Sequence, residues 1–174
     1  MSATPSRPYD DPRAAVRARL SPLLTTLEAP LPPTRLLYRV TGGPPGHRLE
    51  ATLEVSAQGA VKHELLDELH SDEREVVQIQ IPGAEARALL REVVRSGLLT
   101  DPSPRAGFLP DSLVGSIFVE SGDAQYTHHF LADDRQRRRQ GLPLTPPVRR
   151  LRPQLEELRT RTRQKSREPF EPPT

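Results

Sequence analysis

The chain has no cysteine and no tryptophan among its 174 residues, and aromatic residues make up only 4% of it. The lack of cysteine excludes disulfides, thiolate nucleophiles, and zinc or iron–sulfur centres with cysteine ligands. No apolar run approaches the roughly 20 residues that span a bilayer, and the N-terminus lacks the apolar segment of a signal peptide. These absences predict a cytoplasmic protein without a membrane span.

Apolar residues are also scarce, at 34%, whereas proline is abundant with 20 residues. This composition is typical of a modest hydrophobic core with unstructured ends. The length suits one folded domain with tails. We therefore expect a disordered tail at 1–9, a helical element at 10–29, a main domain at 34–160 and a basic, proline-rich tail at 161–174.

The net charge of +2 hides an uneven distribution of charge along the chain. Residues 1–134 carry 13 Lys+Arg and 19 Asp+Glu, a net charge of −6, whereas residues 135–174 carry 12 Lys+Arg and 4 Asp+Glu, a net charge of +8. Such a split influences partners and solubility more than it influences the fold. It makes the C-terminal quarter the place where we expect an anionic partner to bind.

Alternating apolar residues predict four strands in the first half of the main domain. The expected strands are Arg35–Val40, Leu49–Val55, Val61–Leu66 and 76–81, with a loop at Thr41–Gly46 and an acidic loop at Asp67–Glu75. Before them, Asp10-Asp11-Pro12 is typical of a helix start, and Pro22 kinks this accessory helix or divides it into two short ones.

A helix follows the fourth strand, because Ala86, Leu89, Leu90 and Val93 recur at helical spacing. A long loop at Thr100–Asp111 and two strands, Leu113–Val119 and Ala124–Leu131, are expected next. After a polar stretch at 133–141, the last expected element is a helix that starts at Thr145-Pro146-Pro147 and frays from Arg159 onward. This order predicts an α+β fold, in which a mainly antiparallel sheet of about six strands packs against one or two helices.

Metal-binding patterns among the histidines are weak. His128 and His129 are neighbours on an expected strand, so their side chains point to opposite faces of the sheet and do not easily bind one metal ion. His63 and His70 have no carboxylate at ligand spacing, and the chain has no His-Glu-x-x-His motif. We interpret the histidines as surface and rim residues and expect no metal or other cofactor.

Catalytic patterns are equally weak. The serines lack the context of a nucleophile elbow. For Asp111, Asp133 and Asp134, an acid/base pair with the histidines is one interpretation, but we favour the interpretation that they are loop carboxylates. The loop Thr41–Gly46 does not resemble a phosphate loop, because two prolines remove N–H donors and a strand follows it. We expect no enzyme, and we interpret this loop as a turn or as an exposed contact loop for a protein.

The basic C-terminal region is the remaining functional signal. Between Arg135 and Arg167 it has no aromatic residue for stacking on bases, so recognition of single strands or of RNA is poorly supported. Nonspecific binding to a nucleic-acid backbone stays an alternative. A solvated cationic helix, or one that docks on an acidic protein face such as the body of a second copy, is favoured.

Several features follow one another over about residues 34–160: a strand running into Gly-Gly-x-x-Gly (Gly42, Gly43, Gly46), a helix ending in Gly-Leu-Leu (Gly97–Leu99), a long loop reaching Pro110-Asp111, a strand hairpin, and a proline-initiated helix with Leu151 and Leu155. This layout resembles the emfourin family of small bacterial proteins. Some members of that family inhibit thermolysin-type metalloproteases. If the function is similar too, the resemblance implies that a loop blocks a protease active site, with Gly42–Gly46 and Thr100–Asp111 as the candidate loops.

We therefore expect a non-enzymatic domain that binds another protein with an acidic face. It is either an accessory subunit of a bacterial assembly or, as the resemblance implies, an inhibitor-like protein, with nucleic-acid binding as the alternative. The candidate contact residues are Gly42, Gly43, Gly46, His47, Asp111, Arg137, Arg138, Arg139, Arg149, Arg150 and Arg152.

Overall fold

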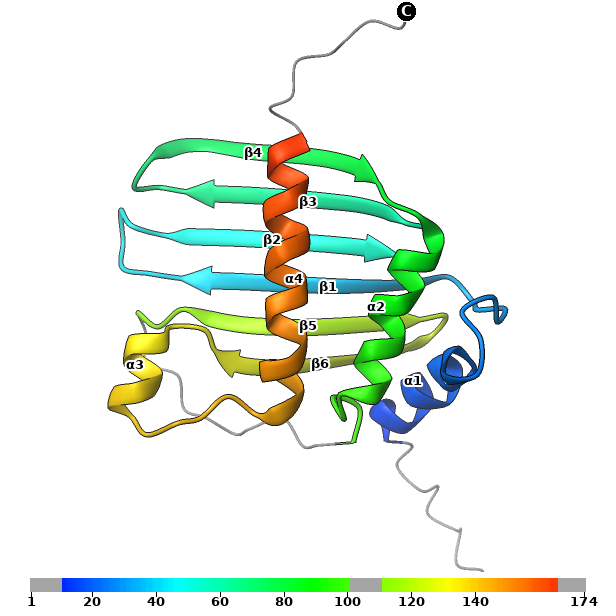
Figure 1. Ribbon diagram of the computed structural model, residues 1–174. Helices are drawn as coiled ribbons and strands as arrows, with labels where there is room; N and C mark the ends of the chain where they lie inside the picture. The colour runs from blue at the N-terminus through cyan, green and yellow to red at the C-terminus, as the bar shows by residue number, and fades with distance from the viewer. Residues whose placement is uncertain (1–10, 101–110, 166–174) are drawn as a thin grey trace, which may run out of the picture.

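Six antiparallel strands form one sheet in the computed structural model, which describes residues 11–100 and 111–165. The strands are β1 (Thr34–Gly42), β2 (Leu49–Ser56), β3 (Ala60–Asp67), β4 (Ser71–Gln80), β5 (Val114–Ser121) and β6 (Ala124–Leu131), in the spatial order β4-β3-β2-β1-β5-β6 (Figure 1). The first four form a meander, and β5 then pairs with the free side of β1. The α+β fold class is confirmed.

One face of the sheet is apolar and the other is charged, as the period of two in a strand requires. On β1, Leu36, Tyr38 and Val40 are buried, whereas the alternate residues Arg35 and Arg39 lie on the opposite face. Within the described residues, that face carries ion pairs and no further layer: Arg39–Glu50 (2.8 Å), Arg74–Glu50 (3.3 Å), Lys62–Glu64 (2.5 Å) and Arg35–Glu120. It is the solvated side of the sheet.

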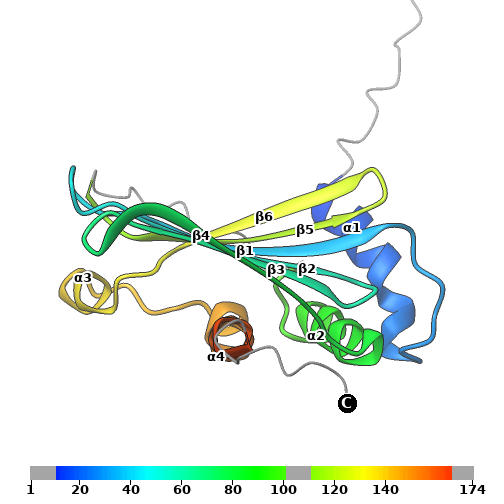
Figure 2. The same ribbon diagram turned by 90° about the horizontal axis from the view of Figure 1, so that it is seen from above.

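Two helices cover the apolar face, α2 (Gly83–Arg95) and α4 (Pro146–Lys165), as Figure 2 shows. The expected apolar stripe of α2 is buried, and α4 buries Leu151, Leu155 and Leu158 as it crosses the strands. Each leucine buried in this way contributes about 2 kcal/mol to stability.

The N-terminal helix is divided at Pro22, as predicted. Asp11 caps α1 (Pro12–Leu20) by accepting a hydrogen bond from the Arg13 amide (3.0 Å), and a 3-10 turn, η1 (Ser21–Leu24), follows. Val16, Leu20 and Leu23 are fully buried in the same core as the sheet and α4. The helix therefore belongs to the main hydrophobic core.

Three elements differ from the sequence expectation. The acidic stretch is not a loop beyond His70, because β4 begins at Ser71, and Arg74 within it pairs with Glu50 of β2 and Glu64 of β3. The polar stretch after β6 contains a short helix, α3 (Asp134–Arg139), and α4 continues to Lys165 instead of fraying from Arg159. The expected tail at 1–9 and nearly all of the loop at 100–111 lie outside the described residues.

Candidate functional site

Several loops meet at one end of the sheet, the end at which β1, β3 and β6 finish and β5 starts (Figure 1). We call this surface the loop end. It consists of the β1–β2 loop (43–48), the β3–β4 turn (68–70), Asp111-Ser112 and α3. Of the sequence-predicted contact residues, Gly43, Gly46, His47, Asp111 and Arg137–Arg139 lie here, with Gly42 at its inner margin.

Gly42 joins the β1–β2 loop to the segment before β5. Its φ of +143° is a conformation that residues with a side chain rarely adopt, and a Cβ at this position would lie 2.1 Å from the backbone oxygen of Ser112. Only glycine permits this close approach of two backbones. Asp111, the last residue of the loop at 100–111 that the emfourin resemblance implicates, is exposed and directly precedes Ser112.

The β3–β4 turn is attached to the same surface. The Arg48 amide donates to Oε2 of Glu68 (3.1 Å), and the Glu68 amide donates to the Arg48 carbonyl (3.0 Å). Leu69, in the β3–β4 turn, is 60% exposed to solvent. The loop end therefore combines a polar frame with an exposed apolar side chain, which a protein partner can bury.

Helix α3 presents arginines to solvent at the loop end. Asp133 caps the helix by accepting from the amides of Arg135 (2.8 Å) and Gln136 (3.0 Å). Arg137 turns inward, where it donates to Asp134 (2.7 Å) and lowers the pKa of that carboxyl. The remaining arginines of α3, Arg135, Arg138 and Arg139, are exposed and make no ion pair within the described part of the chain.

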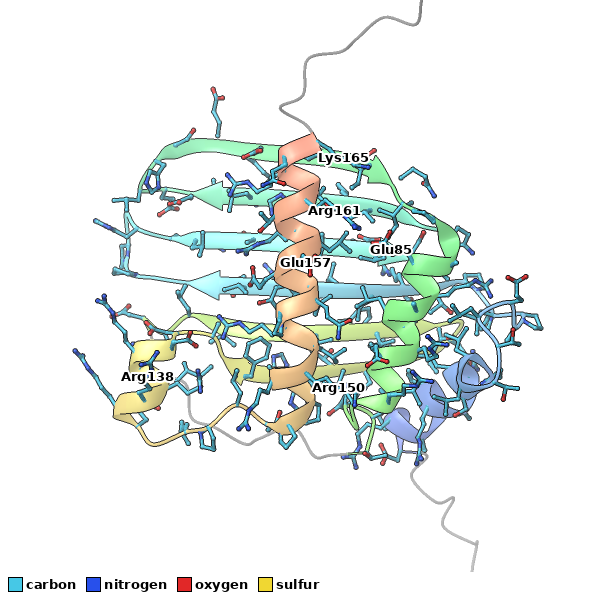
Figure 3. The ribbon with its side chains drawn as sticks, in the orientation of Figure 1. Glu85, Arg138, Arg150, Glu157, Arg161 and Lys165 are labelled. Carbon is cyan, nitrogen blue, oxygen red and sulfur yellow. The ribbon has the colours of Figure 1, made fainter. Side chains whose placement is uncertain are left out.

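Three arginines of α4, in contrast, bind the acidic body of their own chain. Arg150 pairs with Glu92 of α2 (2.8 Å), Arg161 pairs with Glu85 of α2, and Arg163 lies 3.6 Å from Glu75 of β4. Figure 3 shows Arg161 and Glu85 facing each other between the two helices. The uneven charge along the sequence is therefore partly compensated within the fold.

The two other predicted contact residues on α4 are held close to the chain as well. Arg152 donates to the Ala132 carbonyl (3.1 Å), pairs with Asp134 (3.2 Å) and lies 5.9 Å from the centre of the Phe130 ring. Arg149 is exposed and lies 3.4 Å from the Leu144 carbonyl. Arg152 thus links α4 to the end of β6 and to α3.

Buried polar residues beneath α4 were missed by sequence reasoning. His63 and His128 are fully buried, so the interpretation of the histidines as surface and rim residues is wrong for both. They share one row across the apolar face with Tyr38, whose hydroxyl donates to Glu156 of α4 (2.6 Å) and whose pKa is raised by burial. Alternation alone could have placed His63 inward, because it stands between Val61 and Leu65.

His63 has no hydrogen-bond partner for either ring nitrogen within the described residues. Burial, together with the nearby charges of Arg159 and Arg163, lowers the pKa of His63 to about 4. The ring therefore stays neutral at neutral pH, which suits a packed side chain and not an acid/base group that works near pH 7.

A hollow of ≈ 250 Å³ lies between α2 and α4, with Ile81, Leu89 and Leu158 among its lining residues. Two ion pairs bridge the two helices there, Glu85–Arg161 (Figure 3) and Glu92–Arg150. Within residues 11–100 and 111–165, no three His, Asp or Glu side chains are grouped as metal binding requires. Two of the carboxylates that line this hollow, Glu85 and Glu92, are therefore paired with arginines of α4, and Glu157 and Arg91 also line it.

Comparison with models of known protein families found no match, and comparison with curated proteins found none either. Among the helices of the described residues, none is both long and apolar enough to cross a membrane.

Proposed function

We propose that this chain is a non-enzymatic domain that binds another protein through the loop end, and that the partner presents an acidic face. The observation that supports this is the contrast between the arginines. Those of α4 at positions 150, 161 and 163 bind the chain's own carboxylates, whereas Arg138 and Arg139 of α3 stay exposed and unpaired within the described residues.

The loop end suits a protein partner in a second respect. Leu69 offers an apolar contact, and Pro44 and Pro45 limit the conformations of the β1–β2 loop, so less entropy is lost when the loop is bound. The arginines supply steering and specificity for an acidic surface. An accessory subunit of a larger assembly needs these properties and no catalytic group.

We expect Arg138→Glu and Arg139→Glu, singly, to weaken binding of the partner about tenfold, because each replaces attraction to an acidic face by repulsion. The assay is recovery of partners from a nuclease-treated lysate of the source organism, followed by titration of any recovered protein. Arg17→Glu is the matched control, because Arg17 is exposed on α1, away from α3.

A protein that is retained by Arg17→Glu and lost by Arg138→Glu supports the proposal. Equal recovery by all variants contradicts it. Recovery that disappears on nuclease treatment supports the alternative, nucleic-acid binding through the basic region.

The second candidate is a metalloprotease inhibitor, as the emfourin resemblance implies. The contact of Gly42 with Ser112 favours it, because it holds the β1–β2 loop beside Asp111. The test is the residual activity of thermolysin with increasing amounts of the chain. Inhibition at a 1:1 ratio (on the order of nanomolar affinity) supports this function, and full activity in excess of the chain contradicts it.

A further inference from the structure

The two edges of the sheet differ in what protects them. At one edge, α1 packs against β6, and Arg19 of α1 donates to the carbonyl of Ser121 (2.8 Å) and pairs with Asp123 at the β5–β6 turn. At the other edge, no strand within the described residues pairs with the outer side of β4. An unpaired edge offers a row of backbone donors and acceptors to another strand.

The two halves of β4 also differ in chemistry. The first half carries Glu73, Arg74 and Glu75, which are typical of a protected edge. The second half, Val76–Gln80, has the sequence Val-Val-Gln-Ile-Gln, with no charge, no proline and no glycine. Such a sequence is typical of segments that pair with copies of themselves.

We propose that two copies of this chain associate edge to edge through β4, with Val76–Gln80 of each copy paired antiparallel about Gln78. In this register Gln78 lies opposite itself and Val76 lies opposite Gln80. Glu75 lies opposite Ile81 of the other copy, so no like charges face each other across the new ladder.

The exposure and the surroundings of β4 fit this arrangement. The side chain of Val76 is 51% exposed, and Gln78 is exposed on the charged face of the sheet. Helix α4 crosses β4 near Glu75, and Figure 1 shows β4 running on past the helix. Because the paired residues lie on the same face in both copies, the twofold axis is perpendicular to the sheet, and both helical layers lie on one side of a continuous sheet.

Sedimentation equilibrium on the full chain, from about 1 µM to about 1 mM, tests the proposal, since a contact of this size gives a weak dimer. We expect a concentration-dependent dimer that Gln78→Lys weakens about fivefold, because it places two like charges opposite each other. Gln78→Glu has the same effect alone. An equimolar mixture of the two variants regains the dimer, because Lys then faces Glu.

The matched control is Gln125→Lys, which changes an exposed glutamine on β6 at the opposite edge. It leaves the dimer unchanged if the proposal is correct. A wild-type chain that stays monomeric over the whole range overturns it. So does a mixture that fails to restore association, or an equal loss with Gln125→Lys.

Discussion

Gly42→Ala is expected to destabilise the fold by about 3 kcal/mol. Its φ of +143° lies in a region that is almost confined to glycine, and holding another residue there costs about 1–3 kcal/mol. The added Cβ would also lie 2.1 Å from the backbone oxygen of Ser112, so β1 and the segment before β5 must separate. Urea unfolding followed by circular dichroism measures this loss.

Gly46→Ala is the control for this substitution. Gly46 also has a positive φ (+77°), but no atom lies within 4 Å of the position of an added Cβ. The Gly46→Ala substitution should lower the free energy of unfolding by only about 1 kcal/mol, because alanine is less stable than glycine in the left-handed conformation. Equal effects of the two substitutions would contradict the close contact between the backbones of Gly42 and Ser112.

The second large effect is a pH-dependent loss of stability caused by His63. The unfolded chain binds a proton at this histidine near pH 6.5, whereas the folded chain does so only near pH 4. Because the unfolded state holds more protons between these values, stability falls as the pH is lowered through this window. The pKa shift corresponds to about 3 kcal/mol of folding stability, which is fully present above pH 6.5 and is lost as the pH falls toward 4.

His63→Leu should remove this part of the pH dependence. Leucine is of similar size, lacks the two unpartnered ring nitrogens, and needs no charge to be excluded from the core. We expect the variant to be as stable as the wild type at pH 7 or more stable, and clearly more stable at pH 4.5. The free energy of unfolding in urea at several pH values between 7 and 4.5 is the measurement.

His47→Leu, a change at an exposed histidine, shows whether the loss of any histidine gives the same result. An acid profile of His63→Leu that runs parallel to that of the wild type would show that His63 binds its proton equally well in both states. In that case the inference that His63 is buried as an uncharged ring beneath α4 would be wrong.

Local patterns were sufficient to predict most of the fold. The apolar stripe of α2, the hairpins and the division of the N-terminal helix at Pro22 all depend on residues close in sequence, and the structure confirms them. The start of β4 was missed because charged residues disfavour a strand locally. The charge of Arg74 in this part of β4 is paired across the sheet with Glu50, 24 residues earlier, and a local pattern does not show so distant a partner.

The candidate site was harder to predict, because charge counts do not show which charges meet. The sequence places twelve cations in its last quarter but cannot indicate that Arg150 and Arg161 bind Glu92 and Glu85 on another helix. The short α3 was equally hidden, since its cap, Asp133, stands in a uniformly polar stretch. Only the tertiary structure separates paired from exposed arginines.

The central position of β1 has a consequence for how the chain folds. β1 pairs with β2 across a short loop, but its pairing with β5 brings together Thr34 and Ser121, which are 87 residues apart. Closing so long a loop costs entropy before any contact compensates for it, and contacts between distant residues slow folding. The β1–β4 meander is therefore expected to form early, and docking of the β5–β6 hairpin on β1 to limit the folding rate.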